Sequence, residues 1–316
     1  MSDNAPQPVP ALIAAQKMHA NEQAIDIALV RRLIASQFPQ WAHLDLTPVA
    51  SAGTDNALYR LGDELVVRLP RVQSAVAQVG KEQRWLPQLA AALPIAIPAP
   101  LAKGAPAEGF PWAWSVYRWL PGDNARAAPV TDKREAARTL AAFLRALRQI
   151  DPTGGPEPGA HNSGRGVPLA TRDGGVRRAL EALRTDLDSR TLEAAATEWQ
   201  AAIDAPVWDR PGMWIHGDLH GGNMLVDGGR LSAVIDWGCL GVGDPACDLM
   251  VAWTFLDARA REVFRAALDV DDAAWARSRG WALSMALIAL PYYRDTNPGL
   301  VAISNDILRE VLGERA

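Results

Sequence analysis

The strongest constraint on the fold is a change of hydrophobic pattern along the chain. Short apolar runs fill residues 46–69, separated by turn signals at Gly53 and at Gly62-Asp63, and this pattern is typical of β-strands. From residue 131 onward, apolar residues recur mainly at helical spacing, with a short return to strand-like runs before Asp236. The sequence therefore predicts an α+β protein with a β-rich N-terminal lobe and a mainly helical C-terminal lobe.

The same pattern divides the chain into three segments. Residues 1–20 lack a charged start followed by a long apolar run, so they do not read as a signal peptide, and we expect a flexible tail. Residues 21–120 should form the β-rich lobe, which opens with a helix over residues 21–38. Residues 121–316 should form the helical lobe.

Prolines and glycines set further expected boundaries. A helix over residues 73–85 should break at Pro87, and a helix over residues 281–290 should be cut by Pro291. The second helix would have only about ten residues, too few to cross a bilayer. Residues 151–166 are dense in Gly and Pro and should form a loop.

Composition narrows the class of protein and its surroundings. With 316 residues, 49% of them hydrophobic, the chain can bury a sizeable core. A net charge of −4 gives no global basic field, so we expect no nucleic-acid partner. Cys239 and Cys247, the two cysteines, make no disulfide framework and favour a reducing compartment. We therefore expect a cytoplasmic protein without a membrane partner.

The residues that carry chemistry lie between positions 215 and 238. Asp218 is followed by Asn223 across a glycine-containing turn, and Asp236 ends a later strand-like run. The two apolar runs between Asn223 and Asp236 are joined by an Asp-Gly-Gly-Arg turn, which predicts a hairpin that brings these two residues together. Phosphoryl transfer needs a carboxylate for the attacking hydroxyl and hard oxygen ligands for Mg²⁺. This set supplies both kinds of group.

Three segments in this region resemble signatures of the aminoglycoside phosphotransferase and choline kinase family, which has a two-lobed protein-kinase-like fold. Residues 216–223 (HGDLHGGN) resemble its catalytic loop and residues 235–238 (IDWG) its metal-binding segment. Residues 243–249 (GDPACDL) resemble its next signature. The resemblance implies a kinase that uses ATP or GTP and Mg²⁺ to phosphorylate a hydroxyl group of a small molecule.

The resemblance also implies roles for individual residues of the helical lobe. Asp218 would be the catalytic base, and Asn223 and Asp236 would bind Mg²⁺. Asp248 would hold the catalytic loop by accepting backbone hydrogen bonds.

In the β-rich lobe, the resemblance implies a nucleotide site. Gly53 would lie in the turn that covers the phosphates. Arg68 would replace the strand lysine of protein kinases, with Glu82 as its helix partner, and a guanidinium can pair phosphate oxygens in the same place. The backbone at Arg118 and Leu120 would meet the purine base, because this stretch resembles the hinge between the lobes.

The acceptor is the least defined part of the sequence prediction. Acidic residues of the helical lobe could bind amines, so we expect a cationic small molecule, either an antibiotic such as an aminoglycoside or a metabolite. The candidates for this contact are Asp151, Asp173, Asp186, Asp257 and Asp295.

Two other function classes stay open at this stage. His216, Asp218, His220 and Asp236 could form the metal cluster of a hydrolase. A hydrogen-bonding role for His216 within the loop is the competing interpretation. Arg68 in place of lysine would also be compatible with a nucleotide-binding protein that does not catalyse transfer.

Overall fold

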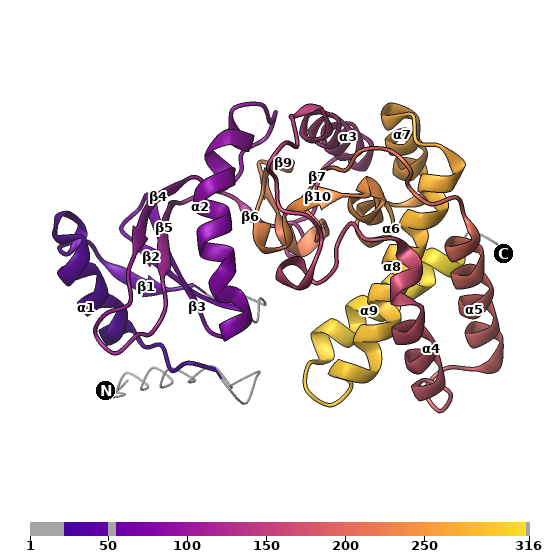
Figure 1. Ribbon diagram of the computed structural model, residues 1–316, viewed down its shortest axis with the longest axis horizontal. Helices are drawn as coiled ribbons and strands as arrows, with labels where there is room; N and C mark the ends of the chain where they lie inside the picture. Colours follow the sequence, from indigo (N-terminus) through magenta and orange to yellow (C-terminus); the bar gives the residue numbers. More distant parts are fainter. Residues whose placement is uncertain (1–21, 50–54, 314–316) are drawn as a thin grey trace, which may run out of the picture.

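A five-stranded antiparallel sheet forms the centre of the first lobe. The computed structural model describes residues 22–49 and 55–313, and the strands lie in the spatial order β1-β2-β3-β5-β4 (Figure 1). Alternate side chains of β2 and β3 are buried, as expected when one face of a sheet packs on a core. The strands are β1 (Leu46–Pro48), β2 (Asn56–Leu61), β3 (Leu65–Pro70), β4 (Pro100–Gly104) and β5 (Trp114–Arg118).

Helix α1 (Ile27–Gln37) packs on this sheet. It begins after Asp26, whose carboxylate accepts a hydrogen bond from the N–H of Leu29 at 2.7 Å and so caps the helix. Its buried side chains, among them Leu33 and Ile34, belong to the same hydrophobic cluster as the inward-facing residues of the sheet. The first lobe therefore has a core of its own.

Helix α2 (Val76–Ala90) lies between the sheet and the second lobe (Figure 1). Trp85 of this helix packs edge to face on Trp214 of the second lobe, with 4.9 Å between the ring centroids. The prediction that Pro87 breaks the helix is wrong, because the helix continues past it. Pro87 is exposed, whereas Leu89 beyond it is fully buried, so packing outweighs the hydrogen bond that the proline removes.

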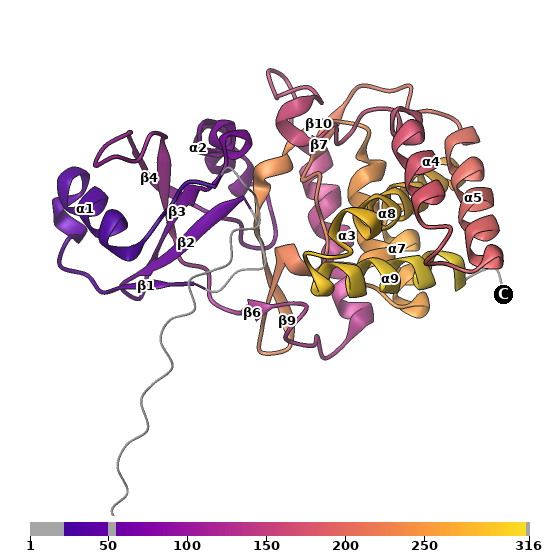
Figure 2. The ribbon, with the colours of Figure 1, turned by 90° about the horizontal axis from the view of Figure 1, so that it is seen from below.

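Helices make up most of the second lobe (Figure 2). Asp132, Asp188, Asp257 and Asp271 each cap one of them by accepting a hydrogen bond from a first-turn N–H group. The helices of this lobe are α3 (Lys133–Gln149), α4 (Asp173–Ala182), α5 (Ser189–Asp204), α6 (Val251–Thr254), α7 (Ala258–Leu268), α8 (Asp272–Tyr293) and α9 (Pro298–Gly313).

Helix α8 is longer than the sequence predicts. It starts before residue 281 and continues through Pro291, which was expected to cut it. Leu287 and Leu290 are buried in the lobe's core on the turn before the proline, and this packing keeps the helix intact. Across the described part of the chain, no helix is both long enough and apolar enough to cross a membrane.

Two small sheets hold the segments where chemistry is expected. β8 (Met224–Asp227) and β9 (Arg230–Val234) form the predicted hairpin, and β6 (Asp123–Asn124) pairs with β8. β7 (Met213–Ile215) pairs with β10 (Gly241–Gly243). The sheet of β6, β8 and β9 lies where the two lobes meet (Figure 2).

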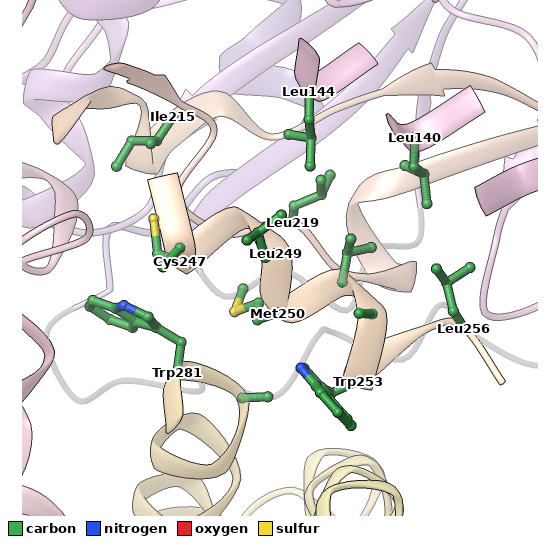
Figure 3. Close-up of a cluster of buried hydrophobic side chains, with 14 of the residues drawn as sticks. Leu140, Leu144, Ile215, Leu219, Cys247, Leu249, Met250, Trp253, Leu256 and Trp281 are labelled. Carbon is green, nitrogen blue, oxygen red and sulfur yellow. The ribbon is translucent and has the colours of Figure 1, made fainter. Parts of the chain in front are cut away.

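A buried hydrophobic cluster supports this region (Figure 3). Leu140 and Leu144 of α3, Ile215 of β7, and Leu219 all belong to it. Leu219 directly follows Asp218 and is fully buried, so the core fixes the backbone next to the expected catalytic base.

The sheet contains a strand that the sequence does not predict. β4 lies in a proline-rich stretch at the edge of the sheet beyond β5, where a strand can tolerate residues without an N–H. β1, β2 and β3 lie within residues 46–69, where strands were expected. The expected tail, residues 1–20, and Gly53 lie outside the described residues.

Gly104 offers a test of the packing in the first lobe. A Cβ atom at this position would lie 2.0 Å from Cε2 of the buried Trp114. We expect Gly104→Ala to lower the free energy of unfolding by about 1–3 kcal/mol, measured by urea denaturation. Gly80→Ala is the matched control, because Gly80 is exposed within α2 with open space around it. That change should raise stability by ~0.5–1 kcal/mol, and equal effects of both changes would contradict the prediction.

Candidate active site

Buried Asp248 holds the candidate catalytic loop, residues 216–223. Its carboxylate oxygens accept hydrogen bonds from the N–H groups of His216 at 2.8 Å and Gly217 at 2.7 Å. Asp248 itself lies in a 3₁₀ turn, η7 (Pro245–Met250). Burial raises the pKa of its carboxyl group. The hydrogen bonds from the two backbone N–H groups lower that pKa again, but only in part. The prediction that Asp248 holds this loop through the backbone is confirmed.

His216 is built into the loop through both ring nitrogens. Nε2 lies 3.0 Å from the carbonyl oxygen of Ile235, and Nδ1 lies 3.2 Å from the backbone nitrogen of Asp218. A neutral ring protonated on Nε2 satisfies both contacts, as donor to the carbonyl and acceptor from the N–H. This arrangement gives His216 a structural role and leaves no ring nitrogen for a metal.

Asp218 has three nitrogen donors around its carboxylate. Nη2 of Arg165 lies 3.2 Å from Oδ1, Nδ2 of Asn223 lies 3.1 Å from Oδ2, and Nε2 of His220 lies 3.4 Å from Oδ2. Burial alone would raise the pKa of Asp218, but His220 and then Arg165 outweigh it and hold that pKa well below its usual range. The carboxylate is therefore a weak base and a good hydrogen-bond acceptor.

Asn223 and Asp236, the expected metal ligands, lie at the two ends of the hairpin. The backbone N–H of Ile235 donates to the carbonyl of Asn223 at 2.9 Å, which brings Asp236 next to Asn223. The amide nitrogen of Asn223 donates to Asp218, and its amide oxygen has no hydrogen-bond partner within residues 22–49 and 55–313. Asp236 has a left-handed backbone (φ 61°), and its side chain is 47% exposed.

Arg68 joins Asp236 to helix α2. Its Nη1 lies 2.5 Å from a carboxylate oxygen of Glu82, and its Nη2 lies 2.7 Å from Oδ1 of Asp236. Glu82 is 1% exposed and also accepts a hydrogen bond from the hydroxyl of Tyr117. Burial opposes the charge of Arg68, but Glu82 and Asp236 outweigh it and raise the pKa of the guanidinium. Arg68 is thus a permanent cation fixed between the lobes.

The expected hinge leaves β5 and enters the second lobe. The N–H of Arg118 donates to the carbonyl of Ala99 at 3.0 Å, so it is engaged within the first lobe. The backbone N–H of Leu120 makes no hydrogen bond to any residue that the structure describes. Of the two expected hinge positions, Leu120 is therefore the one whose N–H is available for a ligand. Gly53, the expected phosphate-covering residue, lies outside the described residues.

Sequence reasoning missed two basic residues of the site, Lys81 and Arg165. Nζ of Lys81 lies 2.7 Å from the carbonyl oxygen of Gly238 and 3.1 Å from that of Leu240, in the segment that follows Asp236. Arg165 reaches Asp218 from a stretch that was expected to be only a loop. Both contacts join residues more than fifty positions apart, so no local sequence pattern could predict them.

The metal cluster of a hydrolase is not formed. His216 uses both ring nitrogens within the loop, and Asp236 binds Arg68. Among the residues that the structure describes, no group of three or more His, Cys, Asp or Glu side chains could hold a metal ion. The geometry therefore gives no support to the zinc-type interpretation.

The acidic residues that were expected to bind amines mostly have protein partners. Asp173 accepts from Nε1 of Trp199 at 2.8 Å, and Asp186 forms an ion pair with Arg294. Asp151 and Asp257 accept hydrogen bonds from backbone N–H groups near them. Most of these carboxylates thus cap helices and turns or balance arginines, while Asp295 is exposed.

The chain matches the model of the phosphotransferase enzyme family, APH, over residues 45–281. This span includes the candidate catalytic, metal-binding and nucleotide-binding residues described above. No curated protein sequence matches the chain.

Solved antibiotic phosphotransferases have a similar fold. The GDP and kanamycin complex of APH(2″)-IIIa is 20% identical with a TM-score of 0.69, covering 91% of this chain and 99% of that one. The apoenzyme of macrolide 2′-phosphotransferase MphH from Brachybacterium faecium is 22% identical with a TM-score of 0.59, covering 90% and 97%. ADP-bound APH(2″)-Ib is 16% identical with a TM-score of 0.57, covering 90% and 98%. The predicted α+β, protein-kinase-like fold is confirmed.

Lys81 gives a pH-dependent test of the contact between helix α2 and the segment after Asp236. Burial lowers the pKa of Lys81 to about 8, whereas an unfolded lysine titrates near ~10.4. Between these values only the unfolded chain keeps the proton, so the contribution of Lys81 to the free energy of unfolding rises with pH. We expect the stability difference between wild type and Lys81→Met to shift in favour of wild type between about pH 7 and about pH 10.

Urea denaturation at both pH values measures this shift. Lys103→Met is the matched control, because Lys103 is an exposed lysine of β4 in the same lobe. Its stability difference from wild type should stay constant with pH. A Lys81→Met variant that follows the wild-type pH dependence would contradict the prediction.

Proposed function

Because the chain belongs to the phosphotransferase enzyme family, we propose that it transfers the γ-phosphate of ATP or GTP to a hydroxyl group of a small molecule. One observation carries this proposal: Asp218 contacts Asn223, the hairpin returns to Asp236, and Asp236 contacts Arg68 of the other lobe. A hydroxyl-orienting carboxylate, two oxygen ligands and a fixed cation therefore line one site. These are the groups that phosphoryl transfer requires.

In the proposed reaction, Asp218 accepts a hydrogen bond from the acceptor hydroxyl and aims its oxygen at the γ-phosphorus. The new bond forms between that oxygen and phosphorus while the bond from phosphorus to the bridging oxygen breaks, which releases the nucleoside diphosphate. The hydroxyl proton leaves through Asp218. Because the transition state of such transfers is loose, little proton transfer is needed before bond cleavage, and the depressed pKa of Asp218 is compatible with this role.

The residues present fit a Mg²⁺ site. Asn223 keeps its amide oxygen free of partners among the described residues, and the Asp236 carboxylate is partly exposed beside it. Two oxygen ligands without His or Cys suit Mg²⁺, which keeps several waters and the phosphates as its other ligands. When bound, the ion would neutralise charge on the transferring phosphoryl group.

In this proposal the first lobe, residues 21–120, binds the nucleotide. Arg68 lies 14% exposed between Glu82 and Asp236, where its guanidinium would face the phosphates. The N–H of Leu120 would donate to the purine ring, with the carbonyl of Arg118 beside it, and Gly53 would cover the phosphates. The second lobe, residues 121–316, would hold the acceptor.

We propose an amine-bearing acceptor, with aminoglycosides as the first class to test. Support comes from relatives of the same fold that were solved with kanamycin, gentamicin or streptomycin. The macrolide phosphotransferases of the same fold make macrolides the second class to test. The proposed location is the cytoplasm, where both nucleotide donors are available.

A screen for nucleotide turnover tests the function. Purified protein with MgATP or MgGTP is assayed for diphosphate release with aminoglycosides, macrolides, choline, homoserine and sugar alcohols. Turnover that depends on one acceptor class, with a phosphorylated product detected by mass spectrometry, would support the proposal. Tight nucleotide binding without turnover on any acceptor would instead favour a nucleotide-binding protein without catalysis.

Removing the charge of Asp236 should abolish transfer and leave the fold intact. Asp236→Asn is a cleaner change than Asp236→Ala, because asparagine tolerates the left-handed backbone at this position better than alanine does. We expect a fall in kcat of at least about 100-fold, with an unchanged circular dichroism spectrum. Asp227→Asn, at the exposed turn of the same hairpin, is the matched control and should keep wild-type turnover. Undiminished activity of Asp236→Asn would rule out the assigned role.

A further inference from the structure

Arg165 is a buried arginine whose guanidinium contacts the carboxylate of Asp218. Its Nη2 lies 3.2 Å from Oδ1, and its side chain is 10% exposed. We propose that Arg165 is a positioning residue that fixes the Asp218 carboxylate and its charge for phosphoryl transfer. This inference rests on the proposed function, because it assumes that Asp218 receives the acceptor hydroxyl.

The chain holds Arg165 in place through its backbone. Within the loop, Nδ2 of Asn162 donates to the carbonyl of Arg165 at 3.0 Å, and the N–H of Arg165 donates to the carbonyl of Asn162 at 3.1 Å. Asn162 is 1% exposed, and its Oδ1 accepts from the N–H of Gly159 at 3.0 Å. One residue later, the carbonyl of Gly166 accepts from the N–H of Asp244 at 2.9 Å. These hydrogen bonds hold the loop in one conformation, and they fix the backbone of Arg165 at its end.

The catalytic loop leaves room for this contact at Gly217. Gly217 has φ 84°, and a Cβ atom there would lie 3.1 Å from Cβ of Arg165 and 2.4 Å from the carbonyl oxygen of Cys239. Only glycine fits a left-handed position with neighbours this close. The residue before Asp218 thus allows the loop of Arg165 to approach the catalytic loop.

The same loop also touches the other lobe. Nζ of Lys81 in helix α2 lies 3.3 Å from the carbonyl oxygen of His161 and 3.1 Å from its Nδ1. Lys81 precedes Glu82, the partner of Arg68. Helix α2 and the loop that carries Arg165 are therefore in direct contact through Lys81.

The Asp218 carboxylate keeps one hydrogen-bond acceptor position on the oxygen that Arg165 contacts. A carboxylate has about four lone-pair positions, two on each oxygen. Asn223 and His220 lie at Oδ2, whereas Arg165 is the one nitrogen donor at Oδ1 among the residues that the structure describes. The remaining position on Oδ1 is the one on which an acceptor hydroxyl can bind. That hydroxyl would then sit on the oxygen that Arg165 orients.

The charge of Arg165 matters because its side chain is only 10% exposed and that of Asp218 only 25% exposed. Loss of one partner of such a pair leaves the other charge uncompensated in a poorly solvated site. Removal of Arg165 should therefore take away the nitrogen donor on Oδ1 and let the Asp218 carboxylate turn away from the acceptor hydroxyl.

The experiment compares Arg165→Met, Arg165→Lys and Arg172→Met with wild type. Arg172 is the matched control, because its guanidinium lies 5.1 Å from the ring of Trp281, near which Arg165 also lies, but it donates to Ser284 and not to Asp218. The assay follows diphosphate release from MgATP and MgGTP at one pH, with the acceptor from the screen and with water as the acceptor, and it measures kcat and KM separately.

We expect Arg165→Met to lower kcat about 10- to 100-fold, while the KM of the acceptor changes less than kcat does. Arg165→Lys should recover part of the loss in kcat, because it keeps the charge without the planar fork. Arg172→Met should keep the wild-type kcat. A wild-type kcat in Arg165→Met would overturn the inference.

A second readout does not depend on turnover. Urea denaturation of Arg165→Met, Asp218→Asn and the double variant forms a double-mutant cycle, and direct contact predicts a non-additive result. Additive effects would overturn the inference even if Arg165→Met is too unstable for rate measurements. Asp218→Asn also separates the two proposals. If it keeps full turnover, the proposed function fails, whereas its inactivity beside wild-type behaviour of Arg165→Met defeats only the positioning role.

Discussion

The buried ion pair between Arg68 and Glu82 is the interaction on which the site depends. Glu82 is almost fully enclosed, with the guanidinium of Arg68 and the hydroxyl of Tyr117 as its partners. Such a pair gains little net stability over apolar residues, but loss of one partner leaves an uncompensated buried charge and costs about 3–5 kcal/mol. The pair therefore specifies the position of helix α2 on the sheet more than it stabilises the fold. Arg68, held in this way, can meet Asp236 of the second lobe.

Helix α2 carries this arrangement across to the second lobe through neighbouring residues. Lys81 binds carbonyl oxygens after Asp236, and Trp85 packs on Trp214 of β7, the strand that leads into the catalytic loop. The backbone adds a further link, because the N–H of Val234 donates to the carbonyl of Ala96 at 2.9 Å. The lobes thus share packing, charge and backbone hydrogen bonds, and the geometry of Asp236 follows from the position of α2.

The parts of this site that the sequence predicts are those with local signals. The β8–β9 hairpin follows from two apolar runs around a glycine turn, and the spacing from Asp218 to Asn223 and Asp236 follows from that hairpin. Local rules fail where distant packing decides: Pro87 lies inside an intact helix because buried neighbours hold it. The contact of Arg165 with Asp218 could not be predicted for the same reason. The loop of Arg165 has no hydrophobic periodicity, and the two residues are fifty-three positions apart.

The charges of the site are paired before any ligand arrives, and this determines what a ligand must do. Asp218 is matched by Arg165, and Asp236 and Glu82 share Arg68. Preorganised charges of this kind need no reorganisation around the developing charge of transfer. Among these paired carboxylates Asp236 is the most exposed, because its side chain is about half exposed and is bound to Arg68 through one oxygen. A ligand that carries both positive and negative charge can replace the ion pair between Arg68 and Asp236. Its cation would then bind the Asp236 carboxylate, and its anion would bind the Arg68 guanidinium. A metal-bound triphosphate has that combination, whereas a free cation or a free phosphate would leave one side of the exchange unpaired.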